Sequence, residues 1–257
     1  MKAIVLLLAG LACAQRGPNS GVEQAPSWAT DGGRVQAKIE LAEALVMNGT
    51  PEAALQMISQ MVEQGVRHPD LLILQGRALT DMGLTVEAES VLQRATRRTP
   101  ASCEAHNRLG ILYFDQARTD EAIKRFKSAV RAAPNDATVH NNLGFALMAA
   151  GRHEEAVDVL RTALMLDGSQ ERTRNNLGFA LAATGDDDSA WRVLKAGSDE
   201  VDARSNLALA QEARGDTQAA LQSYRQTLKL DPNHIDARAA VQRLSASVPN
   251  SSEENTP

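Results

Sequence analysis

Apolar and polar residues follow one another along most of the chain with the period of an amphipathic α-helix. Between residues 35 and 244, apolar positions recur at spacings of three and four, which places them on one side of a helix. A glycine interrupts this pattern in five places and an alanine in a sixth: Gly49, Gly83, Ala117, Gly151, Gly185 and Gly215. Glycine adopts the left-handed backbone conformation that ends many helices. The pattern therefore predicts an all-α protein of short helices joined by tight turns.

These helical segments repeat with a period of 34 residues. Leu109-Gly110 recurs as Leu143-Gly144 and as Leu177-Gly178. Each unit then carries an alanine, followed four residues later by a bulky side chain. The alanines are Ala54, Ala88, Ala122, Ala156, Ala190 and Ala220, and the bulky residues are Ile58, Leu92, Phe126, Leu160, Leu194 and Tyr224. Self-similarity at this period indicates a repeat architecture.

The spacing resembles the tetratricopeptide repeat, including Tyr113, Ala129 and Pro134 in the unit 103–136. The resemblance implies an α-α superhelical solenoid in which each helix pair is stabilised by its neighbours. Its six helix-turn-helix repeats are expected over 35–234, as 35–68, 69–102, 103–136, 137–170, 171–200 and 201–234. A capping helix is expected over 235–246, with its apolar side formed by Ile235, Ala239, Val241 and Leu244.

The fifth repeat, 171–200, is four residues short, which is about one helical turn. We expect its second helix, near Trp191 to Leu194, to end early. Two interpretations stay open at this point. The deletion is either harmless in an outer helix or produces a bend that contacts a partner.

The N-terminal residues have the layout of a secretory signal peptide. One positive charge at Lys2 precedes the apolar run Ala3 to Ala12, which is too short to span a bilayer. Gly10-Leu11-Ala12-Cys13 resembles the lipobox of bacterial lipoproteins, which implies a signal peptide over 1–12 and lipidation of Cys13. Cleavage after Ala14 by ordinary signal peptidase, and a retained cytosolic terminus, are the alternatives.

Lipidation implies a location for the protein. Ala14 follows Cys13, and it does not resemble the aspartate that retains lipoproteins in the inner membrane. The resemblance therefore implies an outer-membrane lipoprotein that faces the periplasm. The alternative is a soluble periplasmic protein. Residues 13–34 contain several glycines and little periodicity, which predicts a flexible lipid-anchored tether. The segment 247–257 is rich in Ser, Asn, Glu and Pro, which predicts a disordered tail.

Composition narrows the classes of function. Apolar residues make up 43% and charged residues 23% of the chain, as in soluble folded proteins. The net charge of −5 argues against a nucleic-acid partner, because phosphate binding needs a basic surface. Aromatic residues are only 3%, so the core must be built from small side chains between closely packed helices.

Candidate chemistry is sparse. His106 and His140 occupy equivalent repeat positions and are expected to fill the edge of the core. Asp186-Asp187-Asp188 opens a helix, where acidic groups suit the helix dipole, and lacks the spaced oxygens of a calcium loop. No catalytic, metal-binding or phosphate-binding motif is present. We therefore expect a protein that is not an enzyme and has no cofactor.

A peptide-binding groove is the site that the resemblance implies. Its apolar lining would include Ile111, Phe114, Phe145, Met148, Phe179 and Leu209. The strip formed by Phe145, Met148, Ala149, Phe179, Ala182 and Ala183 should be partly exposed. Asn142, Asn176 and Asn206 each precede a repeat leucine. Carboxamides can hold an extended peptide backbone. A purely structural role for these asparagines is the alternative.

Two functions follow as hypotheses. The first is a non-catalytic scaffold that binds a segment of an envelope protein in its concave groove and is anchored to the membrane only by lipid. In architecture it resembles the pilotin lipoproteins that assist assembly of outer-membrane secretins for type IV pili, so a secretin is the implied partner. The alternative is a structural scaffold of another envelope complex, such as a tight-adherence pilus apparatus, that uses its outer surface.

Overall fold

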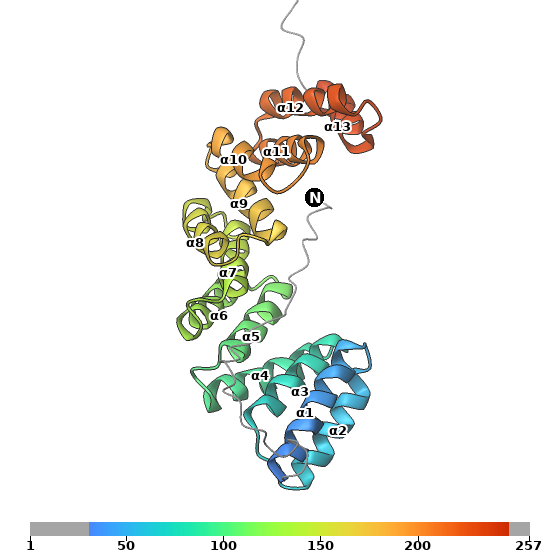
Figure 1. Ribbon diagram of the computed structural model, residues 1–257, viewed down its shortest axis with the longest axis vertical. Helices are drawn as coiled ribbons and strands as arrows, with labels where there is room; N and C mark the ends of the chain where they lie inside the picture. The colour runs from blue at the N-terminus through green and yellow to red at the C-terminus, as the bar shows by residue number, and fades with distance from the viewer. Residues whose placement is uncertain (1–30, 247–257) are drawn as a thin grey trace, which may run out of the picture. The chain divides into compact units, whose positions relative to one another are not determined.

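The computed structural model describes residues 31–246, and its regular elements in that range are all α-helices. Six helix pairs follow one another and a thirteenth helix closes the series (Figure 1), which confirms the predicted all-α repeat fold. The expected signal peptide, the lipidation site Cys13, most of the expected tether and the expected tail lie outside the described residues.

The chain divides into two compact units between Asn142 and Leu143. Each repeat consists of two helices, which we call its first helix and its second helix. The first unit holds α1 (Asp31–Met47), α2 (Pro51–Glu63), α3 (Pro69–Asp81), α4 (Thr85–Arg98), α5 (Cys103–Asp115), α6 (Thr119–Ala132) and the start of α7 (Ala137–Ala149). Each first helix packs against its own second helix, and α1, α3 and α5 also contact one another in that order.

The second unit contains the rest of α7 and the helices that follow it. These are α8 (His153–Leu166), α9 (Glu171–Ala183), α10 (Asp187–Lys195), α11 (Glu200–Arg214), α12 (Thr217–Leu230) and α13 (Ile235–Ser245). Here α9 packs against both α10 and the next first helix, α11, while α13 packs against α12.

Close approach of the two helices in a repeat depends on a small residue facing a bulky one. A Cβ atom added to Gly110 would lie 2.7 Å from Cε1 of Phe126, so any larger residue there would force the Phe126 ring to shift. The same relationship holds for Gly76 and Leu92, for Gly144 and Leu160, and for Gly178 and Leu194. The bulky residues recognised from the sequence are therefore the side chains that cover these glycines.

The turn between the helices of a repeat requires a left-handed residue. Gly83 has a φ of +74° there, and the glycines at the equivalent position of four other repeats are also left-handed. In the third repeat Ala117 takes this conformation with a φ of 59°. An L-residue with a Cβ atom pays about 1–2 kcal/mol for that backbone.

Three details differ from the sequence-based expectations or refine them. Helix α1 begins at Asp31, inside the segment expected to be a tether, and Gly33 within it is buried. Helix α10 has 9 residues where α8 has 14, in agreement with the expected early end.

The third detail concerns the buried side of α13, which differs from the expectation. Ile235 is 79% exposed and Ala239 is also exposed, so the expected apolar side was wrong at both positions. The helix instead buries Ala237, Ala240 and Leu244 against a cluster that includes Leu221 and Tyr224. Two alanines allow α13 to lie close to those large side chains, which decides the orientation of the helix.

Candidate peptide-binding surface

The apolar residues expected to line a groove lie on the first helices, and the fold leaves them partly accessible. In the first unit, Ile111 and Phe114 of α5 are half-buried. In the second unit, Phe145 and Met148 of α7 and Phe179 of α9 are half-buried. Their exposure contrasts with that of the repeat leucines of the same helices, which are buried.

One column of equivalent positions runs through the second unit. Phe145, Phe179 and Leu209 occupy the same place in successive repeats, and Leu209 is 37% exposed. The helices that carry Phe179 and Leu209, α9 and α11, pack against each other. We call Phe145, Met148, Phe179 and Leu209 the first-helix face.

Two alanines of the expected strip differ from each other. Ala183 is half-buried, whereas Ala182 is fully buried and was wrongly expected to be partly exposed. Its backbone carbonyl accepts a hydrogen bond from the guanidinium of Arg214, which covers this part of α9.

The asparagines that precede the repeat leucines are mostly internal. Asn142 is 1% exposed, and its side-chain nitrogen donates a hydrogen bond to the Oδ1 atom of Asn107, 3.0 Å away. Asn176 is also 1% exposed, whereas Asn206 is half-buried. A buried carboxamide that is engaged with another repeat stabilises the fold, and it cannot meet a ligand without leaving its partner.

Sequence analysis missed the partner of Asn142, although a signal was present. Asn107 recurs as Asn141 and Asn175, so a second column of asparagines accompanies the first. Two columns of complementary donors and acceptors at the repeat period indicate pairing between neighbouring repeats more directly than binding of a ligand.

His106 and His140 connect each first helix to the loop before it. The Nε2 atom of His106 lies 3.0 Å from the carbonyl oxygen of Pro100, and that of His140 lies 2.9 Å from the carbonyl of Pro134. A carbonyl only accepts, so Nε2 carries the proton in both rings. Arg174 and Arg238 donate to carbonyls at the same separation in sequence, those of Gly168 and Pro232. These side chains therefore fix the loops, as expected for fillers of the core edge.

Burial also changes the titration of His106. Its side chain is 7% exposed, and its Nδ1 atom has no hydrogen-bond partner within residues 31–246. Desolvation lowers the pKa of His106 below the ordinary value, because the charged ring would be held away from water. The residue is consequently a neutral structural group at neutral pH.

A polar network joins the short fifth repeat to the sixth. Nη1 of Arg214 donates to Oδ1 of Asp187 at 2.8 Å, and Nη2 donates to Asp216 at 3.1 Å. Gln211 donates to Asp187 at 2.7 Å and accepts from the hydroxyl of Ser223 at 2.7 Å. Asp187, expected only to complement a helix dipole, thus bridges α10 and α11.

The rest of the acidic run behaves as a helix start. The side chain of Asp186 accepts a hydrogen bond from the backbone nitrogen of Ser189, 3.1 Å away, as an N-cap. Hydrogen bonds with Ser189 lower the pKa of Asp186 below its usual range.

Among residues 31–246, no group of three or more His, Cys, Asp or Glu side chains is placed to hold a metal ion. No helix in this part of the chain is long and apolar enough to cross a membrane.

Several solved structures share this fold. MamA from Desulfovibrio magneticus RS-1, residues 41 to the end, is 22% identical with a TM-score of 0.55 over 63% of this chain and 92% of that structure. YrrB, described as a TPR protein with an unusual peptide-binding site, is 20% identical with a TM-score of 0.59 over 72% of this chain and 97% of that one. At these identities the likeness shows the fold alone. A search of curated proteins gives no match.

A comparison with family models gives the identity of the repeats. A tetratricopeptide repeat model matches residues 73–137, 107–171 and 188–235, which together make up more than half of the chain. The matched ranges include the glycine and bulky residue of the second, third and fourth repeats. The chain therefore belongs to the tetratricopeptide repeat family.

Proposed function

We propose that this protein is a non-catalytic interaction scaffold, exported as a lipoprotein, whose first-helix face binds a segment of another envelope protein. The observation that carries the proposal is the column Phe145, Phe179 and Leu209, which stays partly exposed. Apolar side chains that the core does not cover are available to a partner. YrrB is described as having a peptide-binding site, which supports a peptide as the class of ligand.

A secretin of a type IV pilus system is the partner that we propose, with the protein acting as a pilotin. The support is the combination of a lipobox-like start ending at Cys13 with six repeats of this family. A pilotin must bind one segment of a client without modifying it. A surface with apolar contacts and no cluster of metal ligands within residues 31–246 suits that task.

The binding face is tested by a pair of matched substitutions in the full chain. Phe179→Asp places a charge on the first-helix face, and Met165→Asp places the same charge on α8, where Met165 is 80% exposed. We expect Phe179→Asp to weaken capture of the secretin by at least about tenfold and Met165→Asp to leave it unchanged. Co-purification with the secretin and the yield of assembled secretin rings measure the effect.

A second substitution keeps this test informative if Phe179→Asp loosens the fold. Leu209→Asp adds the charge at a more exposed position of the same face, and circular dichroism reports the helix content of each variant. Normal capture by both folded variants would contradict binding at this face.

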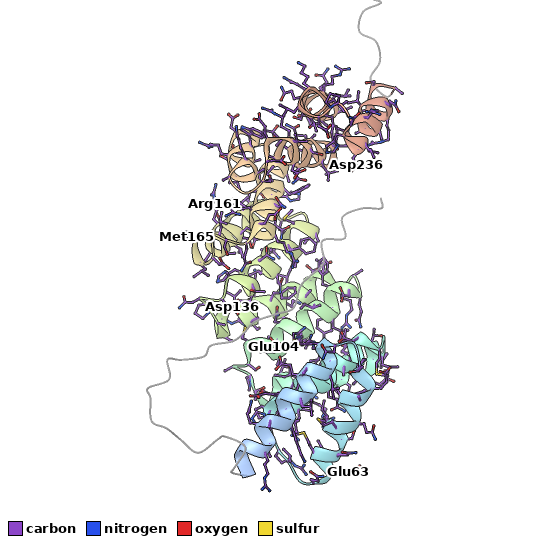
Figure 2. The ribbon with its side chains drawn as sticks, turned by 45° about the vertical axis from the view of Figure 1, so that its right-hand side comes forward. Glu63, Glu104, Asp136, Arg161, Met165 and Asp236 are labelled. Carbon is purple, nitrogen blue, oxygen red and sulfur yellow. The ribbon has the colours of Figure 1, made fainter. Side chains whose placement is uncertain are left out.

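The alternative function, a structural scaffold that uses its outer surface, also has a specific observation in its favour. A cavity of about 450 Å³ beside α8 and α10 is lined by Leu164, Met165, Val193 and others, and its lining also includes Arg161 and Arg192. Figure 2 shows Arg161 and Met165 together on α8. Under this alternative, Met165→Asp disrupts assembly and Phe179→Asp is silent, so the same two variants distinguish the functions.

Anchoring is tested separately from binding. We propose that Cys13 carries the lipid, so Cys13→Ala should move the protein from the membrane fraction to the soluble periplasm. Substitution of Ala12 leaves the thiol in place and serves as a control for signal cleavage. Equal membrane fractions for wild type and Cys13→Ala would contradict lipidation.

A further inference from the structure

A groove in the first unit lies outside the first-helix face. It has a volume of about 750 Å³ and is bounded by α2, the start of α3 and α4. Ile58 and Leu71 form a buried apolar floor, whereas Val62, Val66 and Leu72 remain partly accessible. Val62 is 45% exposed, so a ligand can contact this aliphatic surface without any helix moving.

The edge of the groove is strongly basic. Arg67, Arg94 and Arg98 line it, and the single carboxylate of the lining is that of Glu63 at the end of α2 (Figure 2). Arg94 and Arg98 are separated by one helical turn and lie on the same side of α4. This local excess of positive charge occurs in a chain whose net charge is −5.

The arginines are not neutralised within the described part of the chain. Arg67 donates to the backbone carbonyls of Val62 and Val66, at 3.2 and 3.3 Å, which fixes its side chain at the edge of the groove. Within residues 31–246, neither Arg94 nor Arg98 has a carboxylate within 4 Å or another hydrogen-bond partner. Guanidinium groups in this state bind carboxylates with paired hydrogen bonds.

We propose that this groove is a second docking site, which binds an acidic segment of a partner protein. An aliphatic side chain of the segment lies on Val62 and Leu72, and carboxylates on either side of it meet Arg94 and Arg98. Charge complementarity identifies the occupant, since an apolar floor beside three arginines selects an aliphatic residue flanked by acidic ones. The site is independent of the first-helix face, because it shares no residue with Phe145, Met148, Phe179 or Leu209.

The chain's own terminal segments fit less well. Residues 15–30 carry one positive and one negative charge, at Arg16 and Glu23, and so offer no net complement. The segment 247–257 contains the adjacent pair Glu253 and Glu254. This segment could compete with a partner for the groove, so the experiment has to distinguish the two occupants.

Binding is tested with the full chain and a labelled peptide of alternating leucine and glutamate pairs. Its counterpart with glutamine in place of glutamate is the control probe, and fluorescence anisotropy gives the dissociation constants. We expect Arg98→Gln to weaken binding of the acidic peptide about fivefold, and Arg94→Gln with Arg98→Gln about twentyfold. Arg97→Gln removes the same charge from the neighbouring position outside the groove, and should change affinity less than twofold.

The apolar floor is tested by a second matched pair. Val62→Asp should abolish binding of the acidic peptide. Val86→Asp, at a 77% exposed position of α4 outside the groove lining, should leave binding unchanged. Equal binding of both peptides, or equal effects of Arg97→Gln and Arg98→Gln, would overturn the proposal. A chain ending at residue 246 that binds the acidic peptide at least tenfold more tightly would show that the C-terminal segment is the occupant, and would overturn it also.

Discussion

Asn142 donates a hydrogen bond from its side-chain amide to Asn107, 3.0 Å away, and both carboxamides are buried. The two residues belong to the first helices of the fourth and third repeats. Polar groups withdrawn from water cost free energy unless they are paired, so each asparagine depends on the other. This bond specifies the contact between two repeats more narrowly than apolar packing can.

Replacing Asn142 by alanine should therefore lower stability without altering recognition. The variant leaves Asn107 buried without its partner, and we expect a loss of about 1–3 kcal/mol in the free energy of unfolding measured with urea. Asn206→Ala, at the half-buried equivalent position, is the control and should cost less than about 0.5 kcal/mol. An Asn142→Ala protein that is as stable as wild type but no longer captures its partner would show that this carboxamide contacts the partner.

Gly110→Ala should destabilise the third repeat, although alanine is ordinarily the better helix former by about 1 kcal/mol. The new methyl group would overlap the ring of Phe126, and overpacking of this kind costs about 1–3 kcal/mol. Gly168→Ala is the control, because its Cβ atom would meet only an ordinary contact at 3.6 Å. Thermal unfolding compares the two, and adding Phe126→Leu to Gly110→Ala should recover part of the loss. A stabilising Gly110→Ala would show that the helices can separate.

Arg214→Met should weaken the connection between the fifth and sixth repeats. The substitution keeps most of the aliphatic stem but removes the hydrogen bonds to Asp187 and Asp216, for an expected loss of about 1–3 kcal/mol. Arg225→Met, on an exposed part of α12, is the matched control. Hydrogen exchange of α10 and α11 locates the effect. Equal protection of the α10 and α11 amides in Arg214→Met and Arg225→Met would mean that apolar packing alone joins these repeats.

The lowered pKa of His106 predicts a dependence of stability on pH. Its folded pKa lies below the unfolded value of about 6.5, so the unfolded chain binds the proton more readily and stability falls as the pH drops below about 6.5. His106→Gln should reduce this dependence between about pH 6.5 and pH 5. His68→Asn, at a partly exposed helix N-cap, is the control. Identical pH profiles for wild type and His106→Gln would contradict the assignment.

Features that depend on neighbours in sequence were predictable, and features that depend on packing between helices were only partly so. The helical period and the turn glycines predicted the order of the elements. The buried side of α13 was not determined by period, because Ala237, Ala239 and Ala240 make two faces of the helix nearly equivalent. The contact with Tyr224 selects one of them.

The candidate site shows the same division. The repeat position of Phe179 predicted a partly exposed aromatic side chain, because equivalent positions share an environment. The pairing of Asn142 with Asn107 joins residues of different repeats, so it could be inferred only by comparing two asparagine columns and not from the column of Asn142 alone. The basic groove beside Arg94 and Arg98 arises only when α2 and α4 are placed on either side of α3.

The facing glycine and bulky residue of a repeat explain how this array tolerates a change in length. Gly110 and Phe126, Gly144 and Leu160, and Gly178 and Leu194 are all separated by the same number of positions. The four residues missing from the fifth repeat fall after Leu194, so the deletion spared every such pair. An insertion or deletion between one bulky side chain and the next repeat should therefore be tolerated, whereas insertion of a single residue between Gly178 and Leu194 would rotate the two residues away from each other.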